Sequence, residues 1–309
     1  MEVVKEGTGC VFVSLLVASA VKVGVLNWIR QLAWKRLEKV GEVLALFVYP
    51  VKSCRGVSVT SAIVTDLGLE SSNIRDRLFL VVRSNNKYRH IDMRTVPLMG
   101  LIVPSLHGQC MHLDAPEMPT LVLPLEVNSS PRTLIDCMIY GELFKGTDCG
   151  DQAGSWFSKY LKKDGLRLLY RGNTPECHNQ RSFTDAPCSL FNTASLADLN
   201  ERLAEPVAVR NFRPNIVVSG ASAYDEDNWD EVIIGKVHFQ RIDSCLRCIM
   251  INVDPETGLK NRSNQPLKTL LEYRLDPVEK YAVFGSLLQL ISHPGKICVG
   301  DAVYVMRKT

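Results

Sequence analysis

The stretch EVLALFVYPVKSCRG, Glu42 to Gly56, joins an apolar run of strand length to a polar end that carries Lys52, Ser53 and Arg55. Similar short runs follow it, rich in Val, Ile and aromatic residues and separated by Gly, Pro, Asn and Asp: GVSVTSAIV, RLFLVVRS, LMGLIVPS, TLVLPLEV and LIDCMIYG. Runs of this length and composition are typical of β-strands, and RSNNKY after the second of them favours a hairpin turn. The pattern predicts a sheet-rich, barrel-like domain.

The chain after residue 150 mixes helices with strands. DQAGSWFSKYLKK has the apolar spacing of a helix with Asp151 as its N-cap, and NTASLADLNERL predicts a second helix capped by Thr193 or Ser195. A third helix is expected near PLKTLLEYR, and strands are expected at NIVVSG, EVIIGKVHFQRI, CIMINV and AVYVM. We therefore expect an α+β, sheet-dominated chain.

The N-terminal region carries a long apolar segment. From Cys10 to Ile29 it has the ~20 residues that a membrane-spanning helix needs, with Lys22 as its charged interruption. ASA at Ala18–Ala20 leaves a cleaved signal peptide as the alternative. The basic stretch RQLAWKRLEK follows, so the positive-inside rule favours a membrane-anchor helix with the globular part in the cytosol. The predicted organisation is an anchor and basic linker at 1–40, an N-terminal β domain at 41–175 and a second β domain at 176–309.

The composition argues against some classes of protein. The 36 Lys and Arg nearly balance the 33 Asp and Glu, for a net charge of +3. No basic run is interleaved with aromatic residues, so no nucleic-acid partner is expected. The ten cysteines are scattered through a chain that is long enough to be stable without disulfide bonds. That distribution favours reduced thiols over a secreted disulfide framework, which stays open as an alternative.

The stretch DSCLRCIMINVDPETG, Asp243 to Gly258, holds Cys245 and Cys248 three residues apart. A four-cysteine zinc site needs a second such pair, which the chain lacks, and neither His238 nor His293 lies in the paired spacing of a Cys₂His₂ site. A thioredoxin-type pair opens a helix, whereas this one runs into the strand-like CIMINV. Two ordinary core thiols remain the alternative to a functional site.

Arginines accompany this motif and several predicted strand ends. Arg247 lies between the two cysteines, Arg77 precedes LFLVV, and Arg213 precedes NIVVSG, while Lys52 and Ser53 end the opening run. Each alone is commonly a solvated strand end or a local ion pair. Together they offer fixed cations where loops converge at strand ends, and they predict a pocket for a phosphate-bearing small molecule. A thiolate beside such a pocket would be free to ligate a soft metal.

This combination resembles the MOSC superfamily, the molybdenum-cofactor sulfurase C-terminal domain proteins, and within it the mitochondrial amidoxime-reducing component family. The resemblance covers nearly the whole chain after the apolar segment, through YPVKSCRGV, NIRDR, GTDCGDQAGSWFSKYL, ASLADLNERL, NFRPNIVVSG, WDEVIIGKV, RCIMINVDPETG and HPGKICVGDAVYV. It implies an N-terminal β-barrel-like domain and a MOSC β-barrel domain, with the molybdenum cofactor (Mo-molybdopterin) held between them.

The resemblance also implies roles for particular residues. Cys248 would be the protein ligand to molybdenum and, in that sense, a catalytic residue. We further expect Asn215 to point its polar group at the substrate. The pterin and its phosphate would be held by Lys52, Ser53, Arg77, Arg213 and Arg247.

The activity implied by the resemblance is that of a molybdenum-dependent oxidoreductase that reduces N-hydroxylated compounds such as amidoximes and hydroxylamines. No G-x-G-x-x-G motif follows a strand, so the electrons are expected from partners. The resemblance implies a cytochrome b5-type haem protein and NADH-cytochrome b5 reductase as these partners. It also implies a signal anchor in the mitochondrial outer membrane, with the globular part facing the cytosol.

Three positions depart from the family pattern. Ala186 and Leu246 stand where the family has serine, and Leu287 stands where it has tyrosine. Each lost hydroxyl is expected to cost ~1 kcal/mol of cofactor binding. These departures support an alternative function, a non-catalytic, membrane-tethered carrier of the molybdenum cofactor or a degenerate binding module.

Overall fold

The computed structural model describes residues 37–72, 74–125, 134–139, 142–171 and 188–308. The predicted anchor helix and Ala186 lie outside these residues. No helix within the described ranges is both long and apolar enough to cross a membrane.

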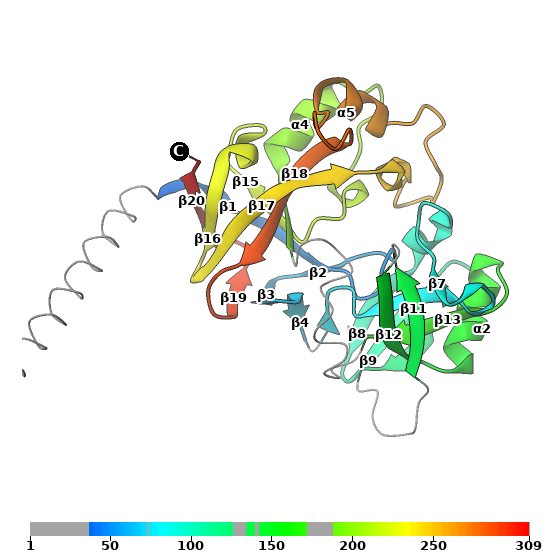
Figure 1. The fold of residues 1–309 in the computed structure, drawn as a ribbon. Helices are drawn as coiled ribbons and strands as arrows, with labels where there is room; N and C mark the ends of the chain where they lie inside the picture. Colours follow the sequence, from blue (N-terminus) through cyan, green and yellow to red (C-terminus); the bar gives the residue numbers. More distant parts are fainter. Residues whose placement is uncertain (1–36, 73, 126–133, 140–141, 172–187, 309) are drawn as a thin grey trace, which may run out of the picture.

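The larger sheet closes into a barrel built mostly from the second half of the chain (Figure 1). Its strand order is β15-β14-β18-β17-β16-β20-β1-β2, and a further pairing of β15 with β1 closes the ring. Its strands are β1 (Glu38–Val48), β2 (Val57–Val59), β14 (Cys188–Asn192), β15 (Ile216–Ser219), β16 (Trp229–Ile234), β17 (Val237–Arg247), β18 (Ala282–Leu290) and β20 (Ala302–Arg307). The apolar run EVLALFV is therefore part of a barrel strand, β1.

The first half of the chain builds a smaller closed barrel, β11-β12-β13-β6-β7, beside the three-stranded sheet β10-β9-β8 and the four-stranded sheet β19-β3-β4-β5. The strands of the small barrel are β6 (Phe79–Arg83), β7 (Arg89–His90), β11 (Leu134–Ile139), β12 (Glu142–Asp148) and β13 (Leu166–Tyr170). The flanking strands are β3 (Ser61–Thr65), β4 (Gly68–Ser71), β5 (Ile74–Arg75), β8 (Val103–His107), β9 (Cys110–Asp114), β10 (Leu121–Pro124) and β19 (Gly295–Cys298). Helix α2 (Asp151–Leu161) packs against β13 and β10 and buries Trp156 and Phe157.

The two halves exchange strands. β1 comes from the start of the described chain but lies in the larger barrel, where Glu42 pairs with Ser219 of β15 and Glu38 pairs with Val305 of β20. In the opposite direction, β19 pairs with β3 of the first half. The predicted domain ranges 41–175 and 176–309 stay a prediction, but they do not divide the strands into two independent sets.

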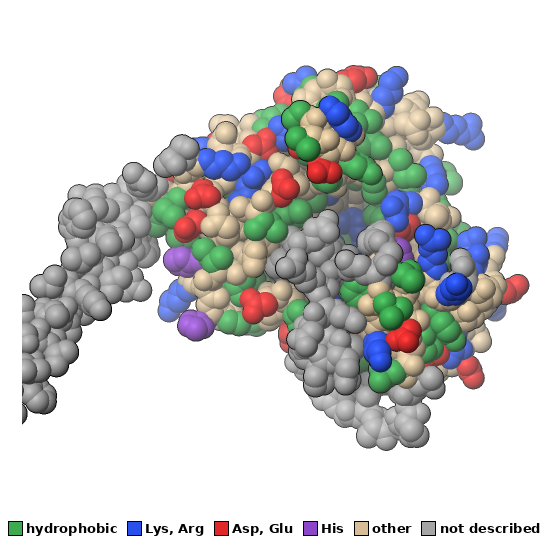
Figure 2. Space-filling model, in the orientation of Figure 1, with side chains coloured by type: hydrophobic (Ala, Val, Ile, Leu, Met, Phe, Trp, Pro, Cys, Tyr) green, Lys and Arg blue, Asp and Glu red, His purple; other side chains and the backbone are tan. Residues whose placement is uncertain are grey.

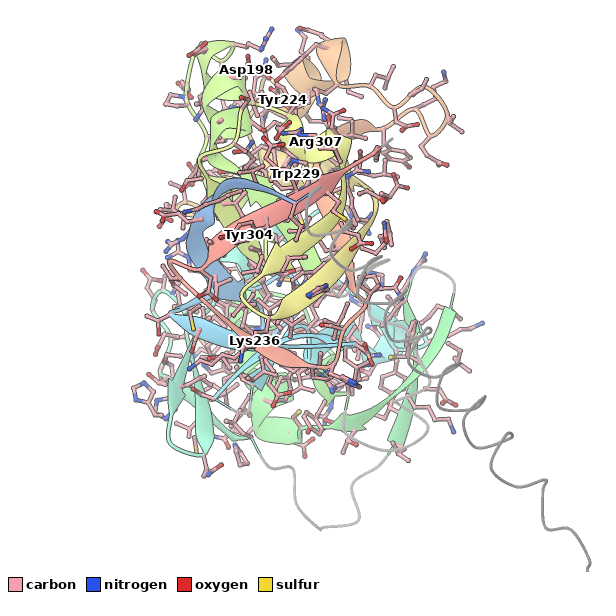
Figure 3. The ribbon with its side chains drawn as sticks, turned by 90° about the vertical axis from the view of Figure 1, so that its left-hand side faces the viewer. Asp198, Tyr224, Trp229, Lys236, Tyr304 and Arg307 are labelled. Carbon is pink, nitrogen blue, oxygen red and sulfur yellow. The ribbon has the colours of Figure 1, made fainter. Side chains whose placement is uncertain are left out.

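An ion-pair cluster ties the ends of the described chain to the larger barrel. Arg307 on β20 binds Glu38 on β1 at 2.7 Å and Asp225 at 2.5 Å (Figure 3). Asp225 also accepts a hydrogen bond from Nε1 of Trp229, which is fully buried on β16. These contacts fix β1 against β20 and so hold the barrel closed where the first strand enters it.

The predicted fold class is confirmed: the chain is sheet-dominated, with α2, α4 (Thr193–Glu201) and α5 (Leu267–Tyr273) as its described α-helices. The predicted hairpin is confirmed too, since β6 and β7 pair antiparallel around RSNNKY. Several strands were not predicted, and β18 is the longest of them. Gly285 interrupts its apolar run with a φ of +78°, which hides the strand pattern.

Three local predictions are wrong. CIMINV is not a strand: β17 ends at Arg247 and a short 3₁₀ helix, η5 (Ile249–Asn252), follows. Helix α4 is capped by Asn192, whose side chain accepts the backbone N–H of Ala194, and not by Thr193 or Ser195. Asp151 is the first residue of α2 rather than its N-cap, which is Gly150.

Candidate functional site

The predicted site residues all line one pocket of about 720 Å³. They come from distant parts of the sequence: the turn after β1, the turn after β5, the segment before β15 and the end of β17. Figure 2 shows the molecule hollowed between its two halves on this face. The residues brought together are Lys52, Ser53, Arg77, Arg213, Asn215, Arg247 and Cys248.

Three of these residues adopt the left-handed backbone conformation that favours glycine. The φ angles are +70° at Ser53, +52° at Arg77 and +54° at Arg213. Such a conformation costs about 1–3 kcal/mol at a non-glycine residue and persists only where the surrounding structure enforces it. Strained residues of this kind concentrate at functional sites, so their convergence on one pocket supports a binding role.

A buried carboxylate, Asp76, and a buried aromatic ring, Tyr49, position two of the cations. Asp76 forms an ion pair with Arg77 and accepts hydrogen bonds from the Tyr49 backbone N–H at 2.7 Å and from Nδ2 of Asn215 at 3.0 Å. The guanidinium groups of Arg77 and Arg213 lie over the Tyr49 ring, 5.4 and 4.4 Å from its centroid. Burial raises the pKa of Tyr49, so its ring stays a neutral platform for both.

Two arginines of the pocket have no carboxylate partner among the described residues. Arg247 is 7% exposed and donates to the carbonyl oxygens of Phe284 (Nε, 2.8 Å) and Phe212 (Nη1, 3.0 Å). Arg213 stacks on Tyr49 and makes a weak contact with the sulfur of Met93. No described carboxylate therefore neutralises Arg247 or Arg213, and the pocket is left electropositive.

The charge of this cluster acts on Lys52, a buried lysine. Burial, followed by the nearby charge of Arg77, lowers the pKa of Lys52 to about 7. Burial and the charge of Arg213 also lower the pKa of Arg77, to about 10, so Arg77 remains charged at neutral pH. An anion in the pocket would relieve both effects. The donor set therefore fits a ligand that bears a phosphate group.

Cys248 stands at the junction between β17 and η5, where it is the N-cap residue of η5 and is half-buried at the pocket wall. Cys245 lines the same pocket. The eight cysteines of the described chain are free thiols, and its His, Cys, Asp and Glu side chains form no group of three that could hold a metal ion. A metal bound by Cys248 would take its remaining ligands from outside the described residues, as a cofactor-borne metal does.

Comparison with known proteins identifies the family. Residues 40–164 match the MOSC N-terminal beta barrel domain, and residues 169–304 match the MOSC domain. The chain is 41% identical over 298 residues to mitochondrial amidoxime reducing component 2 of Bos taurus. The aligned region covers 88% of this chain and 85% of that protein. The chain belongs to the mitochondrial amidoxime-reducing component family.

Two human members show the same likeness over more of the chain. Identity to mitochondrial amidoxime reducing component 2 of Homo sapiens is 39%, over 95% of this chain and 92% of that protein. Identity to mitochondrial amidoxime-reducing component 1 of Homo sapiens is 38%, over 96% of this chain and 94% of that protein. The names of these amidoxime-reducing components place the relatives in mitochondria and describe them as reducing amidoximes.

Two of the three positions expected to depart from the family pattern lie in the pocket. Leu246, 40% exposed, and Leu287 both line it, and Ile242 stands beside them. Together they form an apolar wall in a pocket that is otherwise rich in cations. The structure thus places both of these expected departures at the pocket itself.

The structure shows a different use for Asn215 than the one expected from the sequence. Its amide is 1% exposed and donates to Asp76 and to the carbonyl of Phe47, while its oxygen accepts from the backbone N–H and hydroxyl of Ser189. An amide committed to four partners within the fold has no donor left for a substrate. Asn215 positions Asp76, and through it Arg77.

Two positioning residues, Asp76 and Tyr49, were not predicted from the sequence. Asp76 stands between two arginines in NIRDR, which invites the interpretation of a self-neutralising surface group. Tyr49 looked like the end of an apolar strand. The signal that could have found Asp76 was a carboxylate at the end of a buried strand, because a buried charge needs a partner. The stacking of two arginines on Tyr49 had no sequence signal.

Proposed function

We propose that this chain is a molybdenum-cofactor-dependent reductase of N-hydroxylated compounds such as amidoximes and hydroxylamines. The observation that carries the proposal is a single electropositive pocket in which strained Ser53, Arg77 and Arg213 meet Cys248. The family supports the same activity, since the names of the relatives describe amidoxime reduction.

In this proposal the side chains bind and orient the cofactor. Lys52, Ser53, Arg77, Arg213 and Arg247 hold the pterin and its phosphate, and Cys248 supplies the protein ligand to molybdenum. When bound, the cofactor supplies the two-electron reduction that, with two protons, converts an N–OH group to N–H and water. Asp76, held by Asn215, keeps Arg77 oriented toward the pocket.

The electrons would come from protein partners. We infer a cytochrome b5-type haem protein and NADH-cytochrome b5 reductase, in line with family membership and with a sequence that has no strand-linked dinucleotide motif. The apolar segment at residues 10–29 would anchor the protein in the mitochondrial outer membrane, with the globular part facing the cytosol. A shared membrane would raise the effective concentration of the partners.

A second candidate function is that of a non-catalytic carrier or degenerate binding module for the cofactor. The observation that favours it is the apolar wall of Leu246 and Leu287, which offers no hydroxyl donors where the family has them. Two lost donors weaken cofactor binding by ~1 kcal/mol each. Four retained cations and the thiolate outweigh that loss, so we favour the enzyme.

Metal analysis combined with an activity assay separates these functions. The purified protein is expected to contain molybdenum and to reduce benzamidoxime when a cytochrome b5 chain and NADH are supplied. Bound molybdenum without turnover would support the carrier. A protein that holds no molybdenum after cofactor loading would contradict both functions and leave two core thiols at the end of β17.

Substitution of the two cysteines tests the role assigned to Cys248. Cys248→Ala is expected to abolish benzamidoxime reduction because it removes the ligand to the metal, whereas Cys245→Ala is expected to keep most of the activity. Molybdenum content and initial rates, measured on both variants, check this. Equal losses in the two variants would show that the thiols act as a pair and would refute the single-ligand role.

A further inference from the structure

A second hollow, of about 370 Å³, lies in the first half of the chain and is strongly basic. Four cations line it: Arg83 on β6, Arg89 on β7, Arg94 in the segment that follows β7, and Lys163 just after α2. Nothing in the proposed cofactor binding uses them. We call these four residues the basic hollow.

Two of the cations face each other across a strand pair. Arg83 and Arg89 are directly paired in the antiparallel register of β6 and β7. Like charges at opposed positions destabilise a sheet. Neither residue, nor Lys163, forms a salt bridge with another part of the described chain, and Nε of Arg83 is buried without a hydrogen-bond partner there. The fold thus keeps cations together at a cost in stability, which is typical of a binding surface.

Asp92 is the carboxylate among the residues that line the basic hollow, and it is already engaged. It binds Arg94 through Nε at 2.9 Å and lies 3.6 Å from Nε2 of His90. Burial opposes its ionisation, but hydrogen bonds from His90 and Arg94 hold the pKa of Asp92 well below its usual range. Asp92 therefore stays charged and offsets Arg94, while the charges of Arg83, Arg89 and Lys163 remain in excess.

The basic hollow adjoins the cofactor pocket. The charges of Asp92 and Arg94 act on the pKa of Lys52 in that pocket, so the two sites lie within electrostatic reach. Figure 2 shows Lys and Arg side chains gathered over β7 and α2, beside the central hollow and on the same face. A protein bound to these cations would therefore cover, or lie next to, the entrance of the cofactor pocket.

We propose that the basic hollow is the docking surface for an acidic electron-carrier protein that reduces the bound cofactor. The inference rests on the proposed function, and it adds where the electrons enter and what the partner's surface must carry. Carboxylates of the partner would neutralise Arg83, Arg89 and Lys163, which speeds encounter and sets the orientation. Reduction of one N–OH group to N–H and water consumes two protons and two electrons, so two reduced carriers, each oxidised by one electron, must dock in turn.

Charge reversal with two different reductants tests the proposal on the full-length, cofactor-loaded protein. Arg89→Glu and Lys163→Glu are each expected to slow reduction by a soluble, acidic b5-type haem protein about tenfold at low ionic strength. The loss should shrink at high salt, because screening weakens the attraction that the variants remove. Turnover driven by reduced methyl viologen, a small radical monocation that added glutamates do not repel, should be unchanged.

Lys236→Glu is the matched control. Lys236 is an exposed lysine in the turn between β16 and β17 (Figure 3), far from β7 in Figure 1. Its reversal makes the same change in net charge and should leave both rates unchanged. Equal losses in Lys236→Glu and Arg89→Glu, equal losses with both reductants, or no loss in either hollow variant would overturn the docking surface.

A binding measurement keeps this outcome separate from failure of the proposed function. The dissociation constant for the b5-type haem protein, measured by calorimetry, should rise about tenfold in Arg89→Glu and stay constant in Lys236→Glu. If the wild-type protein turns over with neither reductant, the reductase function fails, and the calorimetry still decides whether the hollow binds an acidic protein. An unchanged constant in Arg89→Glu would refute docking there.

Discussion

The pKa of a single residue, Lys52, reflects both its burial and the charge of the pocket. Its ammonium group is buried beside Arg77 and Arg213, and its pKa falls to about 7 from an ordinary value of 10.5. Below pH 7 the folded and unfolded states both hold the proton, so the full penalty of the buried charge acts against folding. Between pH 7 and 10.5 the folded state has released it while the unfolded state has not, and stability rises with pH.

This pH dependence predicts how the substitution Lys52→Met changes the free energy of unfolding. In the cofactor-free protein the variant should be more stable than the wild type below pH 7, by on the order of 3 kcal/mol, because a methionine fills the same space without a charge. The difference should vanish above pH 10.5. Urea unfolding of both proteins at pH 6 and at the alkaline limit measures it.

The same variant should hold less cofactor, because an anion in the pocket needs the protonated lysine. Lys236→Met, at an exposed site, controls for the loss of one charge. A Lys52→Met protein that is less stable at pH 6, or that retains as much molybdenum as the wild type, would contradict an anion-binding role for Lys52.

At the scale of secondary-structure elements, the pairing of β17 with β18 positions Arg247. Two register shifts interrupt their ladder, between Arg241 and Asp243 and between Ser244 and Leu246. Bulges of this kind re-aim side chains near functional sites. On the facing strand, Gly285 has a φ of +78°, and a Cβ atom there would lie 2.7 Å from the Leu190 carbonyl and 3.4 Å from Nη2 of Arg247.

Gly285→Ala should therefore damage both the fold and the pocket. The strained φ and the clash with the Leu190 carbonyl predict a loss of about 2 kcal/mol or more in the free energy of unfolding, together with displaced Arg247 and lower cofactor retention. Gly108→Ala is a matched control, since Gly108 also has a positive φ, +60°, but faces open space. Thermal unfolding and molybdenum content should separate the two variants; equal cofactor loss in both would rule out a steric role for Gly285.

At the scale of the whole molecule, the exchange of strands makes the two halves interdependent. β1 fills the gap between β15 and β20, so the larger barrel cannot close without a strand from the start of the described chain. An open barrel exposes two unpaired strand edges and the buried side chains of Val43, Leu46 and Val48.

A fragment of residues 176–309, the predicted second domain, should accordingly fail to fold cooperatively. The same fragment with residues 38–48 joined to its C-terminus through a flexible linker should regain a cooperative thermal transition, because that strand closes the ring. Circular dichroism and calorimetry of the two fragments test this. A cooperative transition in the unmodified fragment would show that β1 is dispensable for the barrel.

Much of the fold could be predicted from sequence because strand patterns are local. The apolar runs at EVLALFV and RLFLVV each place a β-strand, and EVIIGKVHF covers parts of two, β16 and β17. The cations near strand ends are visible as residue types. Local patterns did not predict the secondary structure correctly where the backbone is irregular. This is the case at Gly285 in β18 and at CIMINV, where a 3₁₀ helix follows Cys248. The partners of Asn215 could not be predicted because they belong to segments that are distant in sequence.

By itself the sequence determined the sheet-rich class, the stock of cations and thiols, and the membership of the family. Only the tertiary structure decided that Lys52, Arg77, Arg213 and Arg247 meet Cys248 in one pocket, that Asp76 and Tyr49 support them, and that β1 closes a barrel formed by the other end of the chain. The physical reason is that strand propensity is set by neighbouring residues, whereas strand pairing and the burial of charge are set by contacts between segments far apart in the chain.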